Sequence, residues 1–149
     1  MVVAAEQLDR RFAEMNADAF ARPPRGWIRA IRDGLGMTTA QLARRMGVTQ
    51  PRISELERSE ASGHITIQSL ERAAEAMGCQ LVYALAPIKP LTDTIQARAM
   101  ALAERQLASI EQTMRLENQG VSDAARHNEA MQRLISALVS KPARLWDEP

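Results

Sequence analysis

The sequence has few aromatic residues, one cysteine and no long apolar run. Aromatic residues make up 3% of its 149 positions, so a core must be built mainly from aliphatic side chains, which suits closely packed helices. Cys79 is the only cysteine, which excludes an internal disulfide and favours a reducing compartment. No stretch approaches the roughly 18 apolar residues of a membrane span, and the N-terminus lacks a secretion signal. We therefore expect a soluble, cytoplasmic protein.

The patterns of catalytic and metal-binding sites are also missing. His64 and His127 are the only histidines, and Cys79 lies in no motif that would activate a thiol. There is no glycine-rich phosphate loop and no cluster of metal ligands. We expect a protein without enzyme activity, cofactor or metal, in which Cys79 is a small buried residue at the end of a helix.

The charge is unevenly distributed, although the net charge is only +1. Residues 22–58 hold eight arginines against three acidic residues, which leaves the remainder of the chain net acidic. Phosphate contacts supply most of the non-specific affinity of DNA-binding proteins. A basic segment of this kind therefore indicates a nucleic-acid face.

Residues 38–58, TTAQLARRMGVTQPRISELER, are the best-defined part of the sequence. Thr38 and Gln41 have the spacing of a capping box, and Gly47 ends the helix that they begin. Thr49 then caps a second helix, with Pro51 in its first turn. Two capped helices separated by about three residues are typical of the helix-turn-helix, whose second helix lies in the DNA major groove. An ordinary helical hairpin that binds nothing is the alternative.

This segment resembles the phage-repressor, or Xre-type, family. The resemblance is carried by Gly36-Met37-Thr38, Leu42-Ala43, Gly47-Val48-Thr49-Gln50, Ile53-Ser54 and Leu56-Glu57. It implies that Arg32 and Glu57 form a buried structural ion pair. The family usually has Gln where Thr39 stands, a residue that contacts a DNA phosphate, so this contact would fall to the Thr39 hydroxyl or to backbone amides.

We expect the DNA-binding residues to lie on the two helices of this segment. We expect the operator to be double-stranded DNA. Arg44 and Arg45 are assigned to its phosphates, and sequence-specific binding is assigned to Thr49, Gln50, Arg52 and Ser54. The full predicted set is Thr39, Arg44, Arg45, Thr49, Gln50, Pro51, Arg52 and Ser54.

The predicted fold is mainly α. We divide the chain into an N-terminal helix and linker (1–22), a repressor-like helix-turn-helix bundle (23–79), one short β-strand (80–88) and a C-terminal helical region (89–149). The last region contains a long helix and a second helix that form an αα-hairpin, which DNA binding does not require. We expect this hairpin to bind a partner.

The segment Gln80–Ala86 shows in part the alternating residue pattern of a β-strand, and Pro87 ends it. A lone strand cannot satisfy its own backbone groups, so we expect it to pair with the same strand of a second chain. The resulting homodimer would use Leu81, Val82, Tyr83, Ala84 and Leu85. Antitoxins of the HipB-like family, which the chain resembles here, dimerise through an apolar strand at this point. An extended tail buried on its own domain is the alternative.

Residues 113–118, TMRLEN, match the (S/T)xxxE(G/N) pattern of the helices that inhibit Fic-domain adenylyltransferases. Thr113 and Glu117 are four residues apart and therefore share a helical face. The resemblance implies that Glu117 pairs with an arginine of the Fic active site and blocks productive placement of the ATP γ-phosphate. A solvated charge near a helix end is the alternative.

The whole chain, from PPRGWI at residues 23–28 to RLWD at residues 144–147, resembles the mobile mystery protein A family. Members of this family are associated with a companion protein that carries a Fic domain. The resemblance implies an antitoxin that inhibits a Fic-domain toxin through Thr113, Glu117 and Asn118 and represses its own operon. Two alternatives stay open: a stand-alone Xre-type repressor whose hairpin only dimerises, and a HipB-like antitoxin of another toxin enzyme.

Overall fold

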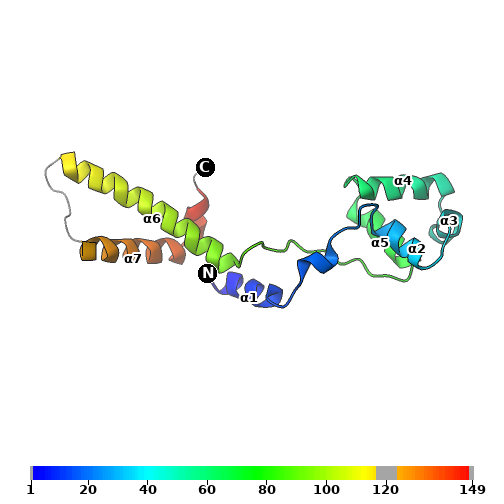
Figure 1. Ribbon diagram of the computed structural model, residues 1–149, viewed down its shortest axis with the longest axis horizontal. Coiled ribbons are helices and arrows are strands. Elements are labelled where there is room, and N and C mark those ends of the chain that lie inside the picture. Colours follow the sequence, from blue (N-terminus) through cyan, green and yellow to red (C-terminus); the bar gives the residue numbers. More distant parts are fainter. Residues whose placement is uncertain (1, 117–123, 148–149) are drawn as a thin grey trace. The chain divides into compact units, whose positions relative to one another are not determined.

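The computed structural model describes residues 2–116 and 124–147, and these residues are mainly helical (Figure 1). They form two compact units. Residues 16–85 make the four-helix unit, and residues 1–15 together with 86–149 make the hairpin unit. The elements are α1 (Val2–Phe12), η1 (Ala17–Phe20), α2 (Trp27–Gly34), α3 (Thr39–Met46), α4 (Gln50–Ala61), α5 (Ile67–Ala76), α6 (Leu91–Leu116), α7 (Ala124–Ser140) and η2 (Pro142–Trp146).

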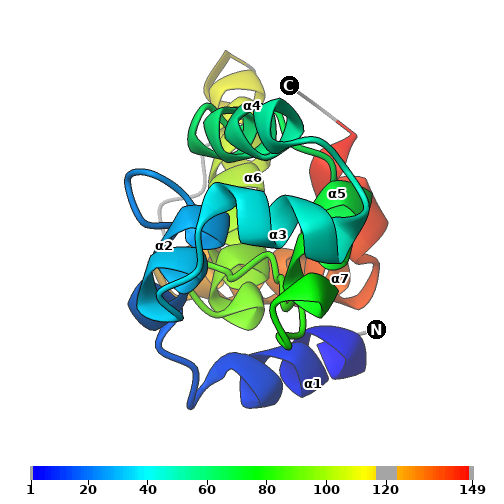
Figure 2. The same ribbon diagram turned by 90° about the vertical axis from the view of Figure 1, so that its right-hand side faces the viewer.

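The core of the four-helix unit is aliphatic, as the shortage of aromatic residues predicts. Helix α3 packs against α4 and α5, and α2 packs against the same two helices (Figure 2). Leu42 of α3 and Ile53 of α4 are fully buried at the centre. Ile28, Ala43, Leu56, Ala73 and Met77 complete the buried cluster.

Most of the predicted helix ends of this unit are confirmed. Gln41 N donates to Thr38 Oγ1 at 3.1 Å and Thr38 N donates to Gln41 Oε1 at 2.8 Å, which closes the capping box. Gly47 ends α3 with a φ of 69°, a left-handed conformation that glycine adopts without a Cβ penalty.

The prediction that the Thr49 side chain caps α4 is wrong. Thr49 occupies the N-cap position but makes no side-chain cap bond. The position two residues on is Pro51, which has no N–H, and the next amide, Arg52 N, donates to the backbone oxygen of Thr49 at 3.0 Å. Neither of the usual donors is therefore left for the hydroxyl.

Two buried carboxylates of α4 hold α2 in place. Glu57 Oε1 accepts from Arg32 Nε at 2.6 Å, which confirms the predicted ion pair, and this bond raises the pKa of Arg32 further above its usual high value. Glu60, only 2% exposed, accepts from the backbone amides of Trp27 and Ile28, each at 2.8 Å. The residue before α2 is Gly26, which has no side-chain oxygen, so Glu60 takes over the capping of these amides.

The predicted strand at Gln80–Ala86 is not observed, since the described residues contain no β-strand. A strand is defined by backbone pairing, and the described part of a single chain offers this segment no second strand. The alternative of a buried tail is also wrong for most of the segment, because Val82, Tyr83 and Leu85 are 70%, 72% and 94% exposed. Cys79, expected to be buried, is exposed as well.

The hairpin unit has its own core between α6 and α7. Ala99, Leu102 and Ala103 of α6 pack against Ile135 of α7 and Leu145 of η2. Helix α1 packs on α6, and its Asp9 carboxylate accepts from Leu91 N at 2.6 Å and Thr92 N at 3.1 Å. The N-terminal helix thus caps the long helix more than 80 residues away. None of the described helices is long and apolar enough to cross a membrane.

Candidate nucleic-acid interface

The start of α3 and the start of α4 meet in an exposed polar surface. Gln50 Nε2 donates to Thr39 Oγ1 at 2.9 Å, so the two helix starts are joined by a side-chain bond. Gln50 and Ser54 are exposed, and Thr39 is half-buried. We call Thr39, Gln50 and Ser54 the reading surface, because Gln and Ser side chains can exchange hydrogen bonds with base edges.

Thr49, Pro51 and Arg52 are exposed beside the reading surface. Arg52 is paired with Glu55 at 3.0 Å, one helical turn further along α4. Glu55 was not among the predicted site residues, although it is exposed on the same helix. Its carboxylate offsets the charge of Arg52 within this surface.

A basic hollow of about 650 Å³ adjoins the reading surface. Thr39 and Ser54 form part of its wall, and Arg25, Arg29 and Arg58 supply its positive charge. Arg32 and Glu57 also line it, but they neutralise each other in the buried ion pair. Three arginines thus line a space next to residues assigned to DNA contacts.

The three guanidinium groups of this hollow are weakly held. Arg29 Nε lies 3.7 Å from Asp33, Arg58 Nε donates to Ser54 O at 3.4 Å, and Arg25 has no ion-pair partner in the part of the chain that the structure describes. These arginines were counted in the basic segment of the sequence but were not assigned to the site. The spacing of Arg58, four residues after Ser54 on one helix, is the signal that could have placed it there.

Arg44 and Arg45 lie in a different hollow, which they share with Gln41 and with Leu35, Gly36 and Met37 before α3. Arg45 Nε donates to the backbone oxygen of Ala76 at 2.7 Å, at the end of α5. Among the described residues, no hydrogen bond, ion pair or shared hollow joins Arg44 or Arg45 to Gln50 or Ser54. Their assignment to phosphates stays a prediction.

The first four residues of the predicted inhibitory motif, 113–116, form the C-terminal end of α6. Thr113 is exposed, and its hydroxyl donates to Ser109 O at 3.0 Å. Glu117 and Asn118 lie outside the described residues. The structure thus places the first residue of the motif on an accessible surface of the hairpin unit.

Comparison with known proteins identifies the domain that carries the reading surface. The helix-turn-helix family model matches residues 28–83, which span α2 to α5 and the first residues after them. No curated protein and no solved structure matches the chain. Residues 28–83 are therefore an Xre-like helix-turn-helix domain, and such a domain indicates a DNA-binding transcription regulator.

Proposed function

We propose that this chain is a dimeric transcriptional repressor that binds a palindromic operator through α4 and serves as the antitoxin of a Fic-domain adenylyltransferase. The observation that carries the DNA-binding part is the reading surface with the basic hollow beside it. Gln50 and Ser54 contact base edges in the major groove. Arg25, Arg29 and Arg58 contact the phosphates that flank the groove.

The separate roles in base and phosphate contacts follow from the chemistry of the two surfaces. An amide such as that of Gln50 can donate and accept at once, which allows a bidentate contact to adenine. A guanidinium group contacts any phosphate and carries no sequence information of its own. Because Gln50 and Arg58 lie on the same helix, the docking of α4 in the groove brings both into contact together.

The proposed dimer rests on the exposed apolar segment after α5. Leu81 and Val82 line an apolar hollow of about 390 Å³ that also includes Phe20 and Trp27. The segment continues to Leu85, one of the most exposed apolar side chains among the described residues. Pairing of Leu81–Leu85 with a second copy would cover this surface. It would also set two recognition helices about 34 Å apart, one turn of DNA.

The proposed antitoxin activity rests on the separate hairpin unit and on the motif at 113–118. The hairpin has its own core and contributes no residue to the reading surface or the basic hollow. Thr113 lies on an exposed face of α6, where a partner can reach it. In this proposal the partner is a Fic-domain protein, and Glu117 enters its nucleotide site, where a carboxylate can pair with an arginine in bidentate geometry.

The DNA-binding proposal can be tested by selecting duplexes from a random pool with the purified full chain and measuring affinities by fluorescence anisotropy. We expect Gln50→Ala to weaken the selected site by about 1 to 3 kcal/mol, with little effect on random duplex. Arg58→Ala should weaken both alike and reduce the slope of log K against log salt by about 1. Arg133→Ala, an exposed arginine of the hairpin unit, is the control that should change neither.

Two outcomes would contradict the assignment. If the pool yields no preferred duplex, the chain is not a sequence-specific binder. If Gln50→Ala and Arg58→Ala both weaken selected and random DNA equally, then Gln50 does not read bases.

A further inference from the structure

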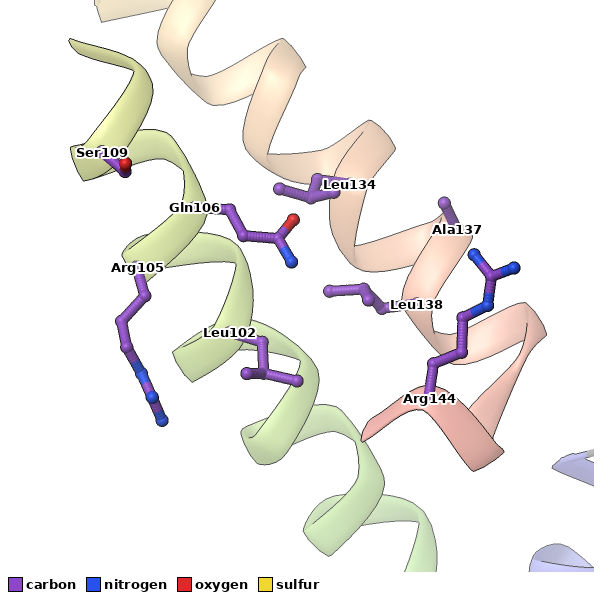
Figure 3. A pocket seen from close by; sticks show the side chains of 8 residues that line it. All are labelled: Leu102, Arg105, Gln106, Ser109, Leu134, Ala137, Leu138 and Arg144. Atoms are coloured by element: carbon purple, nitrogen blue, oxygen red, sulfur yellow. The ribbon is translucent and has the colours of Figure 1, made fainter. Parts of the chain in front are cut away.

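A groove of about 470 Å³ lies on the hairpin unit between α6 and α7 and reaches η2. Figure 3 shows Leu102 of α6 facing Leu134 and Leu138 of α7 across it. Arg105 lies at the α6 edge, and Arg144 lies at the opposite edge, where η2 follows α7 (Figure 3). The floor of the groove is therefore mainly leucine, with the Gln106 side chain reaching into it, and an arginine lies on each side (Figure 3).

The floor belongs to the core of the unit but is only partly covered. Leu102 is 9% exposed and belongs to the buried cluster. Leu134 and Leu138 pack against that cluster yet remain half-exposed. Apolar surface in a concave site between helices is the kind of surface that the apolar side of another helix covers.

Two arginines supply the charge of this groove. Residues 1–15 and 86–149 carry 11 acidic and 10 basic residues, yet none of the described residues that line the groove is acidic. Neither Arg105 nor Arg144 has a side-chain hydrogen bond or ion pair among the described residues. The groove therefore presents two uncompensated positive charges on an otherwise slightly acidic unit.

We propose that this groove binds an acidic amphipathic helix of a partner protein. Apolar side chains of that helix, spaced by three or four residues, cover Leu134 and Leu138, and its flanking Asp or Glu side chains pair with Arg105 and Arg144. Charge complementarity selects an acidic partner, and the apolar floor selects a folded helix with an apolar face. DNA would satisfy the arginines but leave the leucines in contact with a polar backbone.

This surface uses none of the residues of the reading surface or of the motif at 113–118. The binding of an acidic helix can therefore be tested independently of operator binding and of Fic inhibition. The length of α6 places Ser109, another residue that lines the groove, one turn before Thr113. A partner held in the groove thus lies beside the start of that motif.

The test is a selection of displayed helical peptides, with the solvent-facing positions randomised, on the full-length protein. We expect the enriched peptides to combine Leu, Ile, Phe or Met at helical spacing with Asp or Glu beside them. Their binding is then measured by fluorescence anisotropy in about 0.15 M salt. The double variant Arg105→Glu with Arg144→Glu should bind about tenfold more weakly, because it replaces two exposed ion pairs by repulsion.

Arg133→Glu with Lys141→Glu is the matched control, since it makes the same charge change on exposed residues that do not line the groove. It should alter the affinity less than twofold. Leu134→Gln should also weaken binding, and backbone NMR shifts on peptide addition should centre on α6 and α7. The thermal midpoints of the variants show that each one is folded.

Four results would overturn the proposal. The first three are a selection without acidic enrichment, equal losses in the groove and control variants, and NMR shifts confined to the four-helix unit. The fourth is that random duplex DNA displaces the selected peptide from the wild-type protein but no longer binds the groove variant. This result would make the groove a nucleic-acid site.

Discussion

Glu60 is the side chain whose replacement tests most directly how the four-helix unit is held together. Its carboxylate is almost fully buried and accepts from the amides of Trp27 and Ile28, each at 2.8 Å. We consider the isosteric change Glu60→Gln. A carboxamide has one oxygen, so one of the two amides would face an NH2 group that cannot accept its proton.

The cost can be worked from these contacts. A buried donor left without a partner costs about 1 to 3 kcal/mol. Loss of the negative charge at the N-terminus of α2 adds roughly 0.3 to 1 kcal/mol. The free energy of unfolding should therefore fall by about 2 kcal/mol, and for a unit of this size that lowers the thermal midpoint by roughly 8 to 16 °C.

The neighbouring Gly26 gives a second measurement on the same contact. A Cβ at Gly26 would lie 2.6 Å from Glu60 Oε1, and its φ of 88° is unfavourable for any residue with a side chain. Gly26→Ala should therefore be strongly destabilising in the wild-type chain. In a Glu60→Ala background the steric part disappears and only the backbone part remains, so the two changes should not be additive.

Unfolding of the four-helix unit can be followed by the fluorescence of Trp27 in a Trp146→Phe background. Glu71→Gln, on the exposed side of α5, makes the same chemical change without a buried contact and should stay within about 0.5 kcal/mol of the parent chain. A Glu60→Gln midpoint within 2 °C of this control would falsify the capping role of Glu60. Additive costs of the Gly26 and Glu60 changes would refute the steric argument.

Three further predictions concern the other parts of the chain. Partial burial opposes ionisation of Asp9, but the hydrogen bonds from Thr92 and Leu91 outweigh it and hold the pKa of Asp9 below the usual 3.8. The contribution of Asp9 to α1 docking is therefore present above pH 3.8 and is lost as pH falls through the lowered pKa. Hydrogen exchange of α1 amides should show this loss, and Asp9→Asn should abolish this pH dependence. Val82→Pro should remove a ladder donor and shift the protein to monomer in sedimentation if the amide of Val82 is paired, whereas an unchanged dimer would assign the interface to another surface. Glu117→Gly should leave the complex with the Fic-domain protein nearly intact but release adenylyl transfer, while Ile110→Asp, at a half-exposed apolar position of α6, should prevent assembly. A Glu117→Gly complex without adenylyl transfer would mean that the motif only binds the partner.

The features that the sequence predicted correctly are those set by neighbouring residues. The capping box of Thr38 and Gln41 spans three residues, and the left-handed end of α3 depends on Gly47 alone. In local patterns of this kind, the residues that interact lie within a few positions of each other in the sequence. The recognition of Arg32 and Glu57 as an ion pair, 25 residues apart, came instead from the resemblance to the phage-repressor family.

The features that were missed depend on partners distant in the chain. The Glu60 contacts span more than 30 residues, and the bond from Leu91 to Asp9 spans 82. No periodicity marks Asp9 or Glu60 as a cap, since α1 has a second acidic residue and α4 has two others. The strand at Gln80–Ala86 failed for a related reason, because its alternation describes a segment suited to pairing but supplies no partner within the described chain.

The arrangement of α4 links the stability of the domain to its DNA-binding surface. Its buried face carries Glu57 and Glu60, which fix α2, while its exposed face carries Ser54 and Arg58. Helix α2 in turn carries Arg29, which lines the basic hollow with Arg58. Loosening the start of α2 should therefore move arginines that the DNA backbone requires, without touching Gln50. Glu60→Gln should weaken selected and random duplexes by a similar factor, since phosphate contacts are shared by all sequences, and the preference between duplexes should persist.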